Sequence, residues 1–347
     1  MVEIETTVRL PADWESHTRS WIIWPYQEEF SGEQICKIKA CLKQLVQTIL
    51  KYEPVTVIVR PEDADEIQNV FDFSSEIAPD IEIHSTELTW ARDFMPLFVE
   101  DGKGGVTAIG WHFNAWSKKS KSNHEPYTMS DWFSEVTCET VNTSSINDID
   151  KLHSLGCIQS DGEGTLLVTK QNMLEEYQDD ALTEADIESI LKRELGAEKV
   201  IWLENGIWGD NLAQGHVSGL ASFASPGVVV TMFSEDSDHP NTDAFSQNKQ
   251  ILTSSTDAKG RLIEVIEIPQ PMTVLWEDKP LPLSYVNFYP VKGAILVPVF
   301  DDPHDEKALE VYRTLFPNLD VVAIEALPFF RNGGGLHSLL APQPSIQ

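Results

Sequence analysis

The four cysteines and nine histidines of this chain are the side chains with the widest chemical range. A thiolate can act as a nucleophile, an imidazole can carry a proton near neutral pH, and both groups can bind a metal ion. Their spacing does not match a metal site, because the sequence contains neither His-Glu-x-x-His nor Cys-x-x-Cys and the histidines are scattered. We therefore expect no dedicated metal site.

Glycine-rich and serine motifs exclude several common activities. No Walker A loop is present, and the glycine clusters at 161–164 and 333–335 do not match the dinucleotide-binding fingerprint. Ser218 lies in a Gly-His-Val-Ser-Gly segment, which differs from the Gly-x-Ser-x-Gly turn of the α/β-hydrolases. The sequence gives no sign of an organic cofactor, so we expect none.

Strand-like and helix-like segments alternate along the chain and must position any reactive side chain. The strand-like segments, rich in β-branched residues, are 55–60, 106–111, 165–169, 228–233 and 294–300. Helical periodicity is found at 33–50, 183–195 and 305–315, and the second of these opens with a capping-box pattern at Thr183 and Asp186. This alternation predicts an α/β architecture.

No Gly/Pro/Ser-rich linker divides the chain, so we expect a single domain over residues 1–347. The basic, polar segment 117–123 is predicted to be a surface loop insertion. The sequence leaves open whether that loop is only solvated or also docks a partner.

The net charge of the chain limits the kinds of partner that it can bind, and other features of the sequence indicate its location. Its 55 acidic residues outnumber 25 basic ones, which gives a formal net charge of −30. Such a charge repels phosphate backbones and anionic lipid heads, so we expect a small-molecule substrate and neither nucleic acid nor membrane as a partner. The absence of a signal-peptide pattern, of a long apolar run and of a disulfide framework predicts a cytoplasmic protein with reduced thiols. A monomer and a homodimer both remain open.

Six segments resemble motifs of one enzyme family, in the same order and at similar spacing. They are 10–17 (LPADWESH, followed by WIIWP), 90–96 (WARDFMP), 161–167 (DGEGTLL), 215–217 (GHV), 284–289 (SYVNFY) and 332–338 (NGGGLHS). Together they resemble the agmatine deiminase and bacterial peptidyl-arginine deiminase family along nearly the whole chain. The resemblance implies a five-bladed, pseudo-symmetric α/β propeller of the pentein type, with a central pocket.

In that family a cysteine thiolate attacks the guanidinium carbon, a neighbouring histidine handles protons, and acidic side chains hold the planar cation. His216, Asp93 and Arg92 occupy matching positions in this sequence. The resemblance therefore implies a general acid/base at His216, a partner or second carboxylate at Asp93, and a substrate contact at Arg92. A structural interpretation stays open, in which Asp93 pairs with an arginine and His216 is a hydrogen-bonded core histidine.

Four positions depart from the family pattern. Ser338 stands at the nucleophile position, and Ser218, Ser154 and Leu88 stand where the resemblance predicts acidic residues. A serine hydroxyl is far less ionised than a thiol near neutral pH and needs an adjacent base before it can attack. An unpaired guanidinium in a neutral pocket would carry a severe desolvation cost. We therefore expect these four residues to line a substrate pocket that does not support deimination.

Trp208 is expected to face the ligand. It lies eight residues before His216, where the resemblance predicts an acidic run of which only Asp210 remains. Leu212 and Ala213 make the same stretch apolar, and an indole ring beside them would suit an apolar ligand.

Cys157 could serve as a substitute nucleophile, but its position argues against this. It follows Ser154 by three residues, so on a strand it would face the opposite side, and we expect a buried structural thiol. Asp161 and Glu163 are expected to organise the Asp-Gly-Glu-Gly-Thr turn rather than to catalyse a reaction.

Three functions agree with these residues. The first is a repurposed enzyme in which His216 and Asp93 transfer protons on a neutral small molecule, in a cyclisation, isomerisation, dehydration or hydrolysis. The second is a pseudoenzyme that binds a ligand or a partner. The third is a residual deiminase that uses Ser338. The first is favoured over the second, because a drifting scaffold would be expected to lose His216 and Asp93 as readily as the other positions.

Overall fold

The computed structural model describes most of the chain. The described residues are 8–26, 30, 32–75, 77–86, 89–111, 146–149, 156–176, 182–210, 212–213 and 215–345. The loop predicted at 117–123 lies outside them, as do Ser154 and Leu88. The expectations for these residues stay predictions.

The described chain forms two compact units. Unit 1 is drawn from residues 8–15 and 93–268, and unit 2 from residues 16–92 and 269–345. Whether the whole chain acts as one domain stays a prediction.

Unit 1 contains three three-stranded sheets in its described part. They are β4 (Leu97–Glu100), β5 (Val106–Trp111) and β6 (Ile146–Ile149); β7 (Gln159–Ser160), β8 (Thr165–Thr169) and β9 (Lys199–Leu203); and β10 (Ala221–Ser225), β11 (Val228–Phe233) and β12 (Glu264–Pro269). Each sheet opens with an antiparallel pair, and in the first two the third strand runs parallel to the second. A π-helical turn η2 (Gln171–Glu176) and α5 (Glu184–Leu195) connect β8 to β9, and α6 (Asn241–Ser254) connects β11 to β12.

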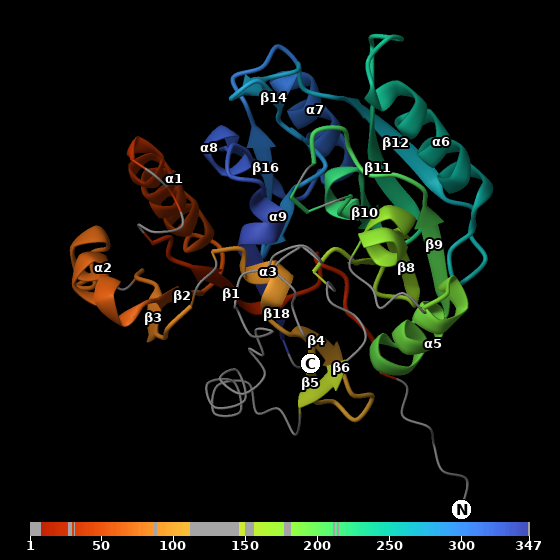
Figure 1. The fold of residues 1–347 in the computed structure, drawn as a ribbon. Coiled ribbons are helices and arrows are strands. Elements are labelled where there is room, and N and C mark those ends of the chain that lie inside the picture. Colours follow the sequence, from red (N-terminus) through yellow and green to blue (C-terminus); the bar gives the residue numbers. More distant parts are fainter. Residues whose placement is uncertain are drawn as a thin grey trace, which may run out of the picture. The chain divides into compact units, whose positions relative to one another are not determined.

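Unit 2 repeats this pattern. Its sheets are β15 (Tyr289–Val291), β16 (Ala294–Val299) and β17 (Asp320–Glu325), and β18 (Leu340–Pro344), β1 (His17–Ile23), β2 (Val55–Val59) and β3 (Asp80–Ile83), with a small hairpin of β13 (Leu275–Trp276) and β14 (Lys279–Pro280). Its longer helices are α1 (Glu33–Ile49), α2 (Ala64–Val70) and α7 (Asp305–Leu315). Again an antiparallel pair is followed by a helix and a parallel strand. The module of two antiparallel strands, a helix and a parallel strand therefore recurs along the chain (Figure 1).

The strands and helices expected from the sequence are present with nearly the same bounds. The strands predicted at 106–111, 165–169 and 228–233 coincide with β5, β8 and β11, and the helix predicted at 305–315 coincides with α7. The predicted capping box is also formed, because Thr183 Oγ1 accepts from the Asp186 N–H at 3.2 Å and the Thr183 N–H donates to the Asp186 carboxylate at 2.9 Å. Local sequence thus specifies these elements.

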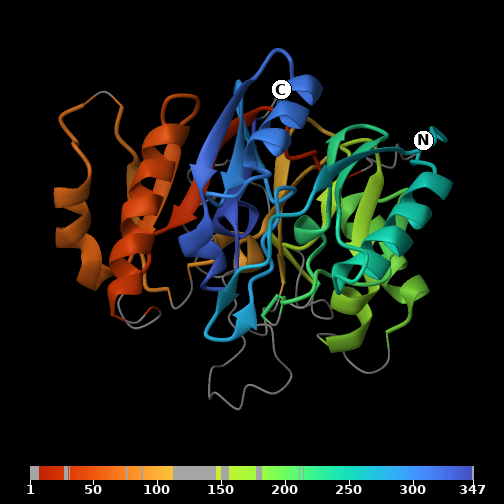
Figure 2. The ribbon, with the colours of Figure 1, turned by 90° about the horizontal axis from the view of Figure 1, so that it is seen from above.

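The core forms where the sheets meet their helices. Every residue of β2, β5 and β8 is buried, as expected for strands covered on both faces. In Figures 1 and 2, α1 lies beside the sheet that contains β1 and β2, and six of its apolar side chains are buried. Burial of these apolar surfaces supplies the main driving force for each module.

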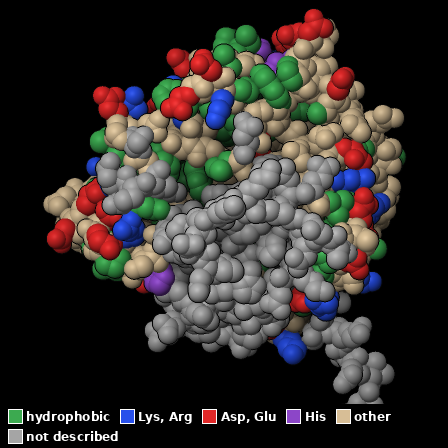
Figure 3. All heavy atoms as spheres, in the orientation of Figure 1, with side chains coloured by type: hydrophobic (Ala, Val, Ile, Leu, Met, Phe, Trp, Pro, Cys, Tyr) green, Lys and Arg blue, Asp and Glu red, His purple; other side chains and the backbone are tan. Residues whose placement is uncertain are grey.

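On the surface, Asp and Glu side chains are spread over the described part of the face in Figure 3 rather than gathered in one patch. No helix in the described ranges combines the length and the apolar character needed to cross a membrane.

Candidate active site

Asp93 and His216 lie together in unit 1. Asp93 belongs to the short helix α3 (Ala91–Phe94), and His216 directly precedes the 3₁₀ turn η3 (Val217–Gly219). The His216 Nδ1 atom lies 3.6 Å from Asp93 Oδ1, and the two side chains are only 5% and 3% exposed. A buried imidazole beside a carboxylate can take up a proton and be stabilised as an imidazolium. The structure thus brings together the two residues that the sequence analysis named as the acid–base pair.

Hydrogen bonds hold the backbone of Ala213 and Gly215, shortly before His216. Asp210 accepts hydrogen bonds from the backbone N–H groups of Ala213 and Gly215, both at 2.8 Å. The carbonyl oxygens of the same two residues accept from Asn172 Nδ2 at 3.2 Å and from Thr169 Oγ1 at 2.6 Å. The two described residues Ala213 and Gly215, which come shortly before His216, are therefore each held at the N–H and at the carbonyl.

Gly215 makes this course possible. Its φ of 91° lies in the left-handed region, and an added Cβ would approach the Gln171 side chain to 3.0 Å. The loop can pass so close to η2 only because residue 215 has no side chain.

Ser218 and Trp208 have opposite surroundings. Ser218 is buried in η3, where it offers a hydroxyl and no negative charge. Trp208 is 41% exposed, and Leu212, in the same loop, is 38% exposed. The segment before His216 thus exposes two large apolar side chains, and contact of Trp208 with a ligand stays a prediction.

The Trp208 segment is anchored although its ring is exposed. Its backbone N–H donates to Asn241 Oδ1 at 2.7 Å, and its ring meets the His239 ring edge-on, with centroids 5.5 Å apart. Burial lowers the pKa of His239 more than the nearby Asp236 raises it. The ring beside Trp208 is therefore neutral at neutral pH and adds no positive charge to this surface.

Ser338 lies in unit 2, in the short helix α9 (Leu336–Leu339), and is 7% exposed. The glycines before it permit close packing, since a Cβ at Gly334 would lie 2.5 Å from the Trp90 ring and one at Gly335 would lie 2.3 Å from Asn287 Oδ1. The same Asn287 oxygen accepts from the His337 N–H at 3.0 Å. The turn that carries Ser338 is therefore built into the core of its unit.

Arg92 also lies in unit 2 and is buried. Its Nε donates to the Leu340 carbonyl at 2.9 Å, and its guanidinium lies 6.0 Å from the centre of the Tyr289 ring. These contacts support β18, so a structural role accounts for the position of Arg92. Its predicted contact with substrate stays a prediction.

Cys157 is buried and Asp161 organises its turn, as expected from the sequence. Cys157 is 1% exposed, and its thiol donates to Asn172 Oδ1 at 2.8 Å. Asp161 Oδ1 accepts from the N–H groups of Glu163 and Thr165, both at 2.8 Å, and so organises the turn between β7 and β8. Neither residue has the exposure of a nucleophile.

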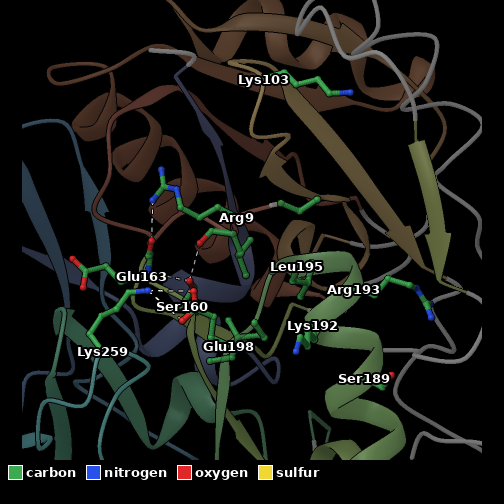
Figure 4. Close-up of a pocket in the computed structure, with 17 residues that line it drawn as sticks. Arg9, Lys103, Ser160, Glu163, Ser189, Lys192, Arg193, Leu195, Glu198 and Lys259 are labelled. Atoms are coloured by element: carbon green, nitrogen blue, oxygen red, sulfur yellow. Dashed lines mark hydrogen bonds and ion pairs between the residues drawn. The ribbon is translucent and has the colours of Figure 1, made fainter. Parts of the chain in front are cut away.

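A separate cavity of about 1180 Å³ lies in unit 1, and neither Asp93 nor His216 lines it (Figure 4). Its charged lining consists of five basic side chains (Arg9, Lys103, Lys192, Arg193 and Lys259) and two acidic ones (Glu163 and Glu198). Arg9 is held by Glu15 and Glu100 and donates to the Gly162 carbonyl, and Lys259 pairs with Glu198. In the described residues, no group of three or more His, Cys, Asp or Glu side chains could hold a metal ion.

The residues that hold the segment before His216 could not be identified from the sequence. Thr169 and Asn172 come from the end of β8 and from η2, and nothing in their local pattern marks them as partners of residues 213 and 215. Asp210 was noted only as the remainder of an acidic run. The left-handed glycine before His216 was the one available signal that the loop takes a specific course.

Comparison with known proteins settles the family. The model of the Porphyromonas-type peptidyl-arginine deiminases matches residues 9–344 of the chain. The chain belongs to this family. A relative from Streptomyces coelicolor that carries the name agmatine deiminase is 32% identical, with 97% of this chain and 99% of the relative covered. A second relative of that name, from Streptomyces avermitilis, is 33% identical, with 97% of each chain covered.

Solved structures of the peptidyl-arginine deiminase family agree in fold. The agmatine deiminase of Enterococcus faecalis superposes with a TM-score of 0.88 at 26% identity, covering 98% of this chain and 97% of its own. The fold is therefore the α/β propeller of the pentein type that the sequence resemblance predicted, and the recurring modules of the two units are its blades.

Proposed function

We propose that this member of the peptidyl-arginine deiminase family is a repurposed enzyme that transfers protons on a neutral small molecule and does not deiminate guanidinium groups. The observation that carries the proposal is the buried contact between His216 and Asp93, 3.6 Å apart. This pair is present although the neighbouring family motifs end in Ser218 and Ser338.

The charge of the candidate site supports a neutral substrate. A guanidinium keeps its charge at any physiological pH, so burying it requires carboxylates placed around it. Ser218 is buried and uncharged, and the sequence offers Ser154 and Leu88 where acidic residues are expected. Among the described residues, the carboxylate that we assign to the site is Asp93, which already faces an imidazole and would hold a planar cation weakly.

The nucleophile position leads to the same conclusion. Ser338 is buried in a turn packed against Trp90 and Asn287. A hydroxyl with an ordinary pKa is almost entirely protonated at neutral pH, whereas the family reaction requires a thiolate. A covalent intermediate on Ser338 is therefore not part of the proposal.

His216 would act as the proton carrier. Its Nδ1 faces Asp93, which would stabilise the imidazolium, so Nε2 is the nitrogen that would exchange a proton with the substrate. In an isomerisation or a cyclisation, a proton leaves one substrate atom and returns at another, and no further reactant is needed. In a hydrolysis or a dehydration, water is the second reactant or product. Trp208 and Leu212, both partly exposed, would contact an apolar part of the substrate.

The first experiment is an assay for deimination. The pure protein is incubated with agmatine, free arginine and an arginine peptide, and ureido product and ammonia are followed. We expect no turnover above that of a His216→Ala variant. Turnover of any of the three above this control would overturn the proposal and favour a residual deiminase that uses Ser338.

A second experiment searches for the substrate. Neutral metabolites extracted from the source organism are incubated with wild type, His216→Ala and Asp93→Asn, and changes are followed by mass spectrometry. We expect one neutral compound to be consumed by wild type and by neither variant. If wild type binds a compound and leaves it unchanged, the protein is a ligand-binding pseudoenzyme.

A further inference from the structure

Asn172 occupies a position that the acid–base chemistry does not explain. It lies in the π-helical turn η2, is 1% exposed, and uses both ends of its side-chain amide. Its Oδ1 accepts from the Cys157 thiol at 2.8 Å, and its Nδ2 donates to the Ala213 carbonyl at 3.2 Å. Short π-helical turns are frequent at functional sites.

The same turn is tied to the residue directly before His216. The Asn172 backbone N–H donates to Thr169 Oγ1 at 3.2 Å, and Thr169 Oγ1 donates to the Gly215 carbonyl at 2.6 Å. Asp210 holds the N–H groups of Ala213 and Gly215 from within the loop. Ala213 and Gly215 are therefore each held at the N–H and at the carbonyl.

We infer that Asn172 is a positioning residue for His216, and that the Cys157 thiol fixes the direction of its amide. The inference rests on the proposed function, since it assigns a task to the backbone that carries the proposed proton carrier. An amide has one donor end and one acceptor end, so it can serve the Ala213 carbonyl only when Oδ1 faces a donor. The S–H group of Cys157 is that donor.

This arrangement explains why a buried thiol and a buried amide occur together. A carboxylate at position 172 would place an oxygen against the Ala213 carbonyl, and the two acceptors would repel each other. An apolar residue at position 157 would leave Oδ1 buried without its donor. In both cases the loop would lose one of its four fixed points, and the 3.6 Å contact between His216 and Asp93 would loosen.

The test is the titration midpoint of the His216 imidazole, measured by NMR in the absence of any substrate. The variants are Asn172→Ala, Asn172→Asp, Cys157→Ala and Cys157→Ser. A nearby carboxylate raises the midpoint of a histidine, so loosening the contact should lower it by about one pH unit, or tenfold in proton affinity. We expect this shift in Asn172→Ala, smaller ones in Cys157→Ala and in Asn172→Asp, whose added carboxylate opposes it, and recovery in Cys157→Ser, which retains a donor.

Asn248→Ala is the matched control. Asn248 is also a 1% exposed asparagine of unit 1, and it holds the start of the same loop by donating to the Asn205 carbonyl and accepting from the Glu204 N–H. We expect it to lower the melting temperature without moving the His216 midpoint. Equal melting-temperature losses for Asn172→Ala and Asn248→Ala, with an unmoved His216 midpoint in both, would overturn the inference.

The two Cys157 variants keep the test decisive if the Asn172 variants do not fold. If the His216 titration midpoint is the same in Cys157→Ala and in wild type, the thiol does not fix the direction of the Asn172 amide. Because no substrate enters this measurement, its outcome is independent of the assays for the proposed function. If wild type shows no catalysis but the variants shift the His216 midpoint, only the proposed function fails. If the midpoint does not move, only the positioning role of Asn172 fails.

Discussion

His216 Nδ1 lies 3.6 Å from Asp93 Oδ1, with both side chains buried in unit 1. This distance is slightly longer than that of a good hydrogen bond. Such long distances are common in catalytic pairs before the substrate binds. Asp93 belongs to the short helix α3, and His216 follows two residues, Ala213 and Gly215, whose carbonyls accept hydrogen bonds from Asn172 of η2 and Thr169 of β8.

The charge of Asp93 should control the proton affinity of His216. In Asp93→Asn we expect the His216 titration midpoint to fall by about one to two pH units, because a carboxylate favours the imidazolium and an amide does not. NMR titration of the imidazole measures this directly. A midpoint equal to that of wild type would mean that other groups set the proton affinity and that the two residues do not act as a pair.

Restoring the thiol alone should not restore deimination. We expect Ser338→Cys to leave the turnover of agmatine at background, because Ser218, Ser154 and Leu88 would still stand where the family resemblance predicts acidic residues. Ammonia release is the measurement, and a Ser338→Ala variant serves as the background control. Recovery of turnover by the single substitution would contradict the argument from charge.

Glu53 should make the protein sensitive to acid. Burial alone would raise its pKa, but hydrogen bonds from His17 at 3.2 Å, Ser20 at 2.5 Å and the Lys292 N–H at 2.8 Å outweigh burial and lower it. A carboxyl group whose pKa is lower in the folded than in the unfolded state adds stability above its unfolded pKa, near 4.5, and loses it as the pH falls through the folded value.

The comparison of Glu53→Gln with wild type tests this linkage. At neutral pH we expect the variant to be less stable by about 1–3 kcal/mol, the usual effect of losing a hydrogen-bonded charge. Below pH 4.5 the two melting temperatures should converge, because the Glu53 contribution of wild type is lost there. Parallel curves of melting temperature against pH would show that Glu53 does not contribute in this way.

The glycine turn before Ser338 should tolerate no side chain at residue 334. A Cβ there would lie 2.5 Å from the Trp90 ring, so we expect Gly334→Ala to destabilise the protein by about 1–3 kcal/mol through overpacking. Gly219→Ala is the control, because its methyl group would meet Ile207 at an ordinary 3.5 Å. Urea unfolding measures both variants, and equal stabilities would contradict the packing argument.

The secondary structure and the family could be predicted from the sequence because both depend on short-range patterns. Its β-branched residues predicted a strand at 165–169, and helical periodicity predicted a helix at 305–315. Both elements have these bounds in the structure. Six short motifs in the right order indicated the family and hence the pentein-type propeller, which the comparisons confirm. Ser338 stands where the resemblance predicts the nucleophilic cysteine, and the consequence for activity stays a prediction.

The tertiary structure decided which of the recognised residues act together. Nothing in the local sequence shows that Asn172 and Thr169 hold the carbonyls of Ala213 and Gly215, or that Cys157 orients the Asn172 amide. Such contacts join segments that are distant in sequence, so they have no period and no fixed spacing, and they arise only when β8, η2 and the His216 loop pack together. For the same reason the sequence could suggest Asp93 and His216 as partners by resemblance, but only packing brought the two side chains to 3.6 Å.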